Sequence, residues 1–123
     1  MIRVTLPYPP AKLNPNKRLH WAVKAKAVKA YRHDCYLLAK SVMFSTRTKA
    51  AICAFACENK LPIKIIFHYP DKRRRDRDNA IASFKAGADG VADAIGVDDA
   101  DWTPTYLVGD VVKGGAVVIK IGI

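Results

Sequence analysis

Residues 69–79 read YPDKRRRDRDN, and the expected fold is organised around this block. It holds five cations and three carboxylates, a density of charge that is typical of solvated surface. Its order is unusual, because a run of Lys and Arg leads into Asp76 and Asp78, two carboxylates two residues apart. Basic residues attract polyanions, and clustered Asp oxygens suit a hard divalent cation. The block therefore predicts phosphate binding beside a metal ion.

The segments on either side of the block predict a strand and a helix. Ile63–Tyr69 is filled with β-branched and aromatic residues, which favour a strand. Residues 79–95 carry apolar side chains at spacings of three and four, which predicts a helix with a core face. We expect Asp78 to be its N-cap and Gly96 to end it.

Three further segments precede the block. Residues 2–6 alternate in character and predict a first strand. A helix begins near Trp21, with an apolar stripe that includes Tyr31 and Cys35 and continues to Val42. Within residues 46–60, Ala50–Cys57 is a small apolar run that fits a short helix or a strand, and we favour the helix because alanine dominates it.

The C-terminal part predicts two more strands. Residues 104–112 and 116–121 flank Gly114-Gly115, a tight-turn signal, and we expect them to pair as a hairpin. The whole order predicts one α+β domain over residues 1–123. Two main helices would pack on a small mixed β-sheet with a C-terminal hairpin.

Composition restricts the possible partners and compartment. The chain of 123 residues has a net charge of +10 and a pI near 9.7, which favours a polyanion such as nucleic acid, or an anionic membrane surface. We see no apolar run of membrane-spanning length and no signal-peptide pattern, so a cytoplasmic protein is expected. Three cysteines without a Cys-x-x-Cys pair indicate reduced thiols.

A second acidic group follows the predicted helix at Asp98, Asp99 and Asp101. In extended chain Asp76 and Asp78 would point to one side and could bind one Mg²⁺. The helix between the two groups is about 25 Å long at ~1.5 Å per residue. The groups therefore meet only if the Asp98–Asp99 loop folds back or a second protomer supplies it.

Each carboxylate also has a plain structural explanation. Asp78 could serve solely as the N-cap of its helix, and Asp76 could serve solely as an ion-pair partner of Arg75 or Arg77. The acidic residues after the helix could be ordinary loop residues.

Lys85 lies two helical turns after Asp78. Its ammonium could approach the metal site and stabilise charge on a reacting phosphate, or simply pair with Asp89 at i+4. The candidate DNA-binding cations come from the block and from the earlier loop 13–20: Lys72, Arg73, Arg74, Arg75, Arg77, Lys17 and Arg18.

The block closely resembles the central motif of the RusA family of Holliday junction resolvases. In that family a Pro-Asp-basic run ends in Asp-x-Asp-Asn, a helix follows, and an Asp-Asp pair comes next; Asp98-Asp99 matches the pair. The opening Leu6–Pro10 with Asn14 is also similar to the family, so the resemblance spans essentially the whole chain.

This resemblance implies a homodimeric endonuclease that nicks four-way DNA junctions symmetrically in recombination and repair. The implied cofactor is Mg²⁺, with Mn²⁺ as a substitute, and the family often occurs in phage genomes. The family's catalytic carboxylates carry over to Asp76, Asp78 and Asp99, with Asp98 beside them as a further metal ligand. The family's lysine position is Ala82 here, so Lys85 is the candidate replacement.

Two other functions compete with junction resolution. A non-catalytic nucleic-acid-binding protein would use the same cations, but it has no use for carboxylates that repel phosphate. A nuclease for flaps or forks would carry the same residues as a resolvase.

Overall fold

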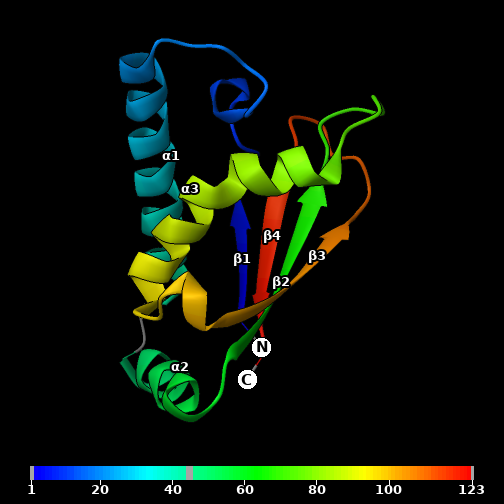
Figure 1. The fold of residues 1–123 in the computed structure, drawn as a ribbon. Helices are drawn as coiled ribbons and strands as arrows, with labels where there is room; N and C mark the ends of the chain where they lie inside the picture. The colour runs from blue at the N-terminus through cyan, green and yellow to red at the C-terminus, as the bar shows by residue number, and fades with distance from the viewer. Residues whose placement is uncertain (1, 44–45, 123) are drawn as a thin grey trace.

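The structure, a computed structural model, describes residues 2–43 and 46–122 and places helices against one face of a four-stranded sheet (Figure 1). The strands are β1 (Ile2–Leu6), β2 (Leu61–His68), β3 (Trp102–Val108) and β4 (Ala116–Ile121). The helices are α1 (Trp21–Val42), α2 (Thr46–Glu58) and α3 (Arg77–Ile95), with short 3-10 turns η1 (Ala11–Leu13) and η2 (Asp99–Asp101). The predicted α+β class and mixed sheet are confirmed, and α2 confirms the helical interpretation of Ala50–Cys57.

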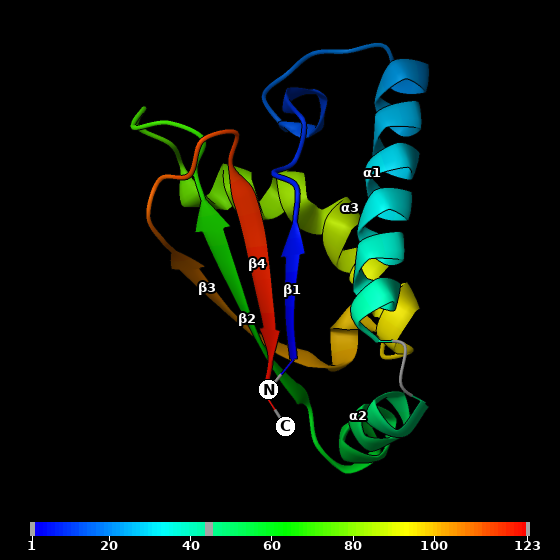
Figure 2. The same cartoon turned by 180° about the vertical axis from the view of Figure 1, so that it is seen from behind.

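The sheet has the strand order β1-β4-β2-β3. β4 runs antiparallel to both β1 and β2, whereas β2 and β3 are parallel and are joined through α3. In β2 the buried residues alternate with more exposed ones, as expected for a strand with one face on the core. Figure 2 shows that the helices leave the other face of the sheet uncovered.

The predicted C-terminal hairpin is wrong, because β2 lies between β3 and β4. The tight turn does exist: Gly114 and Gly115 have φ of 80° and 74°, and the Gly115 N–H donates to the Val112 carbonyl at 2.8 Å. The connecting segment, however, is held across the end of β2. The N–H groups of Gly109 and Val112 donate to the carbonyls of Phe67 and Tyr69, both at 3.0 Å. The chain therefore returns on the far side of β2.

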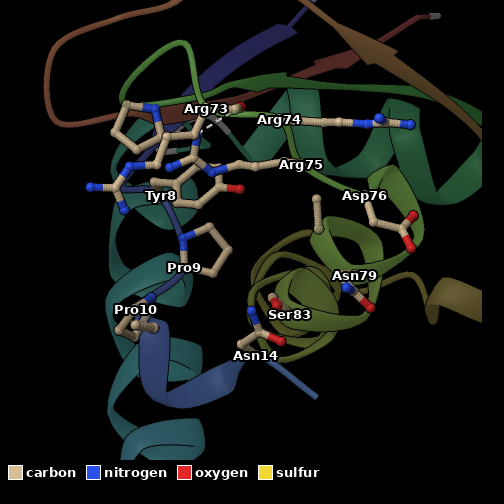
Figure 3. Close-up of a pocket in the computed structure, with 13 residues that line it drawn as sticks. Tyr8, Pro9, Pro10, Asn14, Arg73, Arg74, Arg75, Asp76, Asn79 and Ser83 are labelled. Atoms are coloured by element: carbon tan, nitrogen blue, oxygen red, sulfur yellow. Dashed lines mark hydrogen bonds between the residues drawn. The ribbon is translucent and has the colours of Figure 1, made fainter. Parts of the chain in front are cut away.

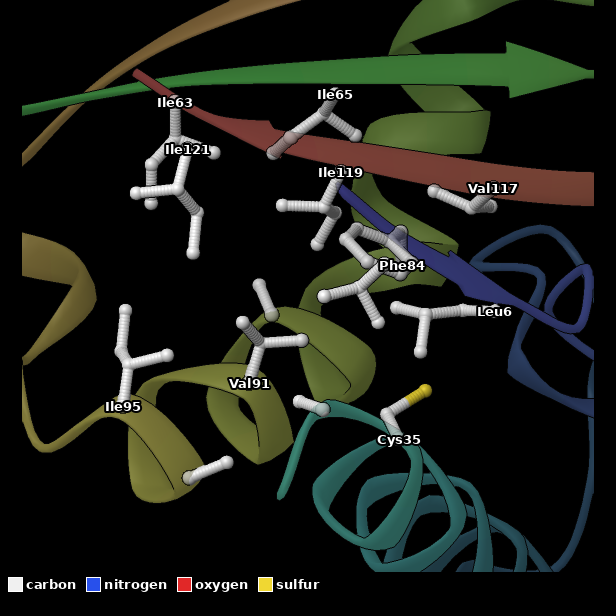
Figure 4. Packing of buried hydrophobic residues seen from close by; sticks show 14 of the residues in the cluster. Leu6, Cys35, Ile63, Ile65, Phe84, Val91, Ile95, Val117, Ile119 and Ile121 are labelled. Atoms are coloured by element: carbon white, nitrogen blue, oxygen red, sulfur yellow. The ribbon is translucent and has the colours of Figure 1, made fainter. Parts of the chain in front are cut away.

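The core lies between the sheet and the helices α1 and α3 (Figure 4). Phe84, Val91 and Ile95 of α3 meet isoleucines and valines of the strands, while Cys35 enters from α1. The predicted apolar face of residues 79–95 is thus confirmed. Gly96 caps α3 in the left-handed conformation, with φ of 76°.

The apolar stripe expected along α1 is only partly buried. Tyr31, Cys35 and Ala39 are buried, whereas Trp21 is 76% exposed and Val42 40%. Because the helix has 3.6 residues per turn, side chains at alternating spacings of three and four gradually rotate around α1. Only the middle of α1 packs against neighbouring elements. None of the helices within residues 2–43 and 46–122 has the length and apolarity needed to cross a bilayer.

Candidate nucleic-acid and metal site

A cleft of about 550 Å³ opens at the N-terminal end of α3. Three segments that are distant in sequence line it (Figure 3): the chain after β1, the basic loop after β2, and the first turns of α3. Its polar and charged lining residues are Tyr8, Asn14, Arg73, Arg74, Arg75, Asp76, Asn79 and Ser83. Cations and a carboxylate therefore share one hollow.

The basic loop is held by Arg75. Its guanidinium donates to Asp71 Oδ1 at 2.6 Å and lies 5.4 Å from the centre of the Tyr69 ring. The hydrogen bond from Arg75, followed by that from the Arg73 backbone N–H, lowers the pKa of Asp71 to about 2, so the ion pair persists at neutral and mildly acidic pH. Arg75 thus positions the loop. Arg73 and Arg74 are exposed, and Arg73 Nε lies 3.9 Å from Asp71 Oδ2.

The opposite wall of the cleft is tied to α1 and to the sheet. The Tyr31 hydroxyl on α1 donates to the Pro7 carbonyl at 2.6 Å. Tyr8 packs edge-on against Tyr69, with ring centres 6.1 Å apart, and a Cβ on Gly115 would approach Tyr8 Cβ to 2.8 Å. These contacts bring the ends of β1 and β2 and the start of β4 together around the cleft.

Asp76, and not Asp78, is the N-cap of α3. Asp76 is extended (ψ of 122°), and its Oδ1 accepts the Asp78 N–H at 2.9 Å. An Asp-x-Asp sequence offers two possible caps, and the helix takes the first, which leaves Asp78 in the first turn beside the positive end of the helix dipole. The expectation that both carboxylates point to one side of an extended chain is therefore wrong.

Both carboxylates nevertheless remain exposed at one helix end. Mg²⁺ is usually held by one or two carboxylates together with water and substrate phosphate, and Asp76 and Asp78 supply such a donor set. Among residues 2–43 and 46–122 there is no group of three or more acidic, His or Cys side chains placed to hold a metal ion. The residues present offer two exposed carboxylates at this helix end, and substrate oxygens would have to complete any metal site formed there.

The second acidic group folds back only part of the way. Asp98 caps η2 by accepting the Ala100 N–H, whereas Asp99 accepts a hydrogen bond from the Lys85 ammonium. Lys85 also donates to Asp89 at 2.8 Å, the i+4 pair anticipated from sequence. The backbone positions of Asp78 and Lys85 are about 10 Å apart along the helix axis, at ~1.5 Å per residue. The structure therefore brings Asp99 to Lys85 and not to Asp76 or Asp78.

Lys85, Asp89 and Asp99 stabilise one another in their charged forms. Hydrogen bonds to Asp89 and then Asp99 raise the pKa of Lys85, and the bond from Lys85 lowers the pKa of Asp99. Lys85 is therefore a fixed cation on the flank of α3.

The other candidate cations are mostly exposed. Lys72, Arg73, Arg74 and Arg77 project from the loop and the start of α3. Lys17 lines a neighbouring hollow of about 590 Å³ that shares Tyr8, Pro10 and Ala11 with the cleft. Arg18 is exposed next to Lys17 in the chain but lines neither hollow.

Sequence reasoning missed part of the cleft wall. Ser83 was not a candidate, and Tyr8 and Asn14 entered only through the family resemblance. Ser83 lies one helical turn after Asn79, so projecting the motif onto a helix could have identified it. Nothing local in the sequence indicates that Tyr8 meets Tyr69.

No known protein-family profile matches the chain. An uncharacterized protein of Xylella fastidiosa (strain Temecula1 / ATCC 700964) is 37% identical to it over 122 residues, which is 98% of this chain and 76% of the relative. At this identity and coverage the two proteins belong to one family.

Proposed function

We propose that this chain, a member of the same family as the Xylella fastidiosa protein, is a Mg²⁺-dependent endonuclease that resolves four-way DNA junctions. The single observation that carries the proposal is the cleft, which Arg73, Arg74 and Asp76 line together. Cations alone would suit any nucleic-acid binder, but a carboxylate in the phosphate path repels DNA unless a metal ion lies between them. The choice of a four-way junction as the substrate rests on the resemblance of residues 70–79 to RusA resolvases.

In this proposal each part of the cleft has a task. Arg73 and Arg74 bind phosphates and orient the strand, while Asn79 and Ser83 offer hydrogen bonds on the adjacent face of α3. Asp76 and Asp78 would hold Mg²⁺, whose chemistry is to neutralise phosphate charge and activate water. Lys85 pairs with Asp89 and Asp99 and does not line the cleft, so in this proposal it orders the flank of α3 and does not contact the reacting phosphate.

The proposal includes a twofold dimer. Two symmetric nicks need two active sites, and a closed dimer supplies them with matching geometry. A second protomer could also bring further carboxylates, such as Asp98, towards the pair at the start of α3.

The proposal is tested by incubating the purified protein with labelled four-way junction, fork, flap and linear duplex. With Mg²⁺ or Mn²⁺ we expect paired nicks in the junction; with excess chelator we expect cleavage to stop while binding persists, because binding depends on the arginines. Sedimentation in the same buffers reports the dimer.

Each alternative function gives a different pattern in that experiment. Cutting of forks or flaps in preference to junctions would identify a nuclease for other branched DNA. Tight junction binding without cleavage under any divalent ion would identify a non-catalytic binding protein. Full cleavage in excess chelator would show that the activity does not require a metal ion.

The exposed arginines of the loop are expected to set the salt dependence of binding. Arg73→Gln with Arg74→Gln should lower the slope of log K against log [salt] by about 2, at ~0.9 per phosphate contact. Fluorescence anisotropy on a junction in chelator measures this slope. Arg47→Gln with Lys26→Gln removes equal charge elsewhere and is the control; equal slopes for both variants would mean that the loop faces away from DNA.

A further inference from the structure

The uncovered face of the sheet carries a row of three cations. Residues that point to the core include Val4 of β1, Ile63 and Ile65 of β2, and Ile119 and Ile121 of β4. Since side chains alternate along a strand, Arg3, Lys64 and Lys120 point to the other face.

Strand register places these cations side by side. Lys120 is paired directly with Arg3 on one side and with Lys64 on the other. Neighbouring strands lie about 4.8 Å apart, so the three Cα atoms span about 10 Å across the sheet. Arg3 and Lys64 are exposed, and Lys120 is half-buried between them.

Within the described part of the chain, no carboxylate is paired with this row. The four strands contain no Asp or Glu. Throughout residues 2–43 and 46–122, no ion pair or side-chain hydrogen bond is made by Arg3, Lys64 or Lys120. Like charges directly opposite each other destabilise a sheet, whereas an ordinary solvated face gains from mixed charge. The arrangement thus costs stability until an anion covers it.

We propose that this face, defined by Arg3, Lys64 and Lys120, binds the phosphate backbone of a duplex arm, separately from the cleft. The inference rests on the proposed function in taking branched DNA as the ligand. The face lies on the side of the sheet opposite α3 (Figure 2), so we assign it to a different arm of the junction from the one at the cleft. A second copy of this chain is a poor occupant, because twofold symmetry would set three cations against three.

Charge removal on this face tests the proposal. The triple variant Arg3→Gln, Lys64→Gln, Lys120→Gln should lower the salt slope of junction binding by about 2 to 3 and weaken affinity near 0.1 M salt on the order of 10- to 100-fold. Lys64→Arg with Lys120→Arg keeps the charge and should bind like wild type. The triple Lys26→Gln, Lys29→Gln, Arg47→Gln on α1 and α2 removes equal charge and should change the slope far less. Because repulsion is relieved, the first variant should melt no lower than wild type.

A second readout locates the contact directly. Acylation of lysine amines, followed by mass spectrometry, should show Lys64 and Lys120 protected by bound junction and Lys26 unprotected. Equal slopes for the two triple variants, together with unprotected Lys64 and Lys120, would overturn the inference while leaving the nuclease intact. If junction binding depends on this face but no cleavage occurs, the inference about the face is supported and the nuclease proposal fails. If the triple variant of Arg3, Lys64 and Lys120 loses binding to phosphatidylserine vesicles while its DNA binding is unchanged, the face binds a membrane and the inference is overturned.

Discussion

Asp78→Asn is expected to slow junction cleavage by about 100-fold or more, since even outer-shell partners of metal ligands cost 10- to 100-fold. The substitution removes one negative charge from the start of α3 and keeps the size of the side chain. Binding should be unchanged or tighter, because repulsion towards phosphate falls. Single-turnover cleavage in Mg²⁺ and anisotropy in chelator measure the two effects separately.

Asp76→Asn is expected to behave in the same way without unfolding the helix. The Asn side-chain oxygen can still accept the Asp78 N–H, so the N-cap is retained. Asp76→Ala would also remove the cap, at about 1 kcal/mol of stability. The two Asn changes should be non-additive in combination if both carboxylates serve one metal.

Asp101→Asn is the matched control for these variants. Asp101 is exposed and acidic, and it belongs to the second acidic group without lining the cleft. Asp71 is unsuitable, because its carboxylate anchors Arg75 and its loss would disturb the loop. Normal cleavage by Asp78→Asn, with a slow Asp101→Asn, would show that the metal ligands are assigned wrongly.

Local chemistry was enough to predict most of the elements. The alternation in β2, the 3–4 spacing in α3 and the glycine at position 96 each depend on a few neighbouring residues, and each is found as expected. The hairpin failed because Gly114-Gly115 specifies a turn but not the strand that receives it. That choice depends on hydrogen bonds from residues 109–112 to the end of β2, which no local pattern reveals.

In the candidate site, too, some features could be predicted from local sequence and others depend on packing. The arginines and aspartates of residues 71–78 could be read from sequence because they are contiguous. Two long-range pairings could not: Lys85 with Asp99, and Tyr8 with Tyr69. The cationic row on the sheet was also hidden, since Arg3, Lys64 and Lys120 come together only through strand register. Which residues meet across elements is decided by packing, and packing depends on the whole chain.

Gly90→Ala is expected to destabilise the protein by about 2 kcal/mol, within the 1–3 kcal/mol typical of overpacking. A Cβ at Gly90 would lie 2.2 Å from the Arg32 carbonyl oxygen and 3.1 Å from the Tyr36 nitrogen, both backbone atoms of α1. Backbone cannot rotate away as a side chain can, so the two helices would have to separate. Helix propensity alone predicts the opposite sign, a gain of about 1 kcal/mol for Ala over Gly.

Ala82→Gly is the matched control, because Ala82 is exposed on the same helix and should lose only the propensity term of about 1 kcal/mol. Thermal unfolding should place Gly90→Ala below both wild type and this control, by roughly 3–6 °C per kcal/mol for a chain of this size. A Gly90→Ala protein that melts at or above wild type would mean that α1 and α3 do not cross at this residue. The consequence extends to the cleft, since Tyr31 of α1 holds the wall at Pro7, and a displaced α1 moves that wall away from Asp76.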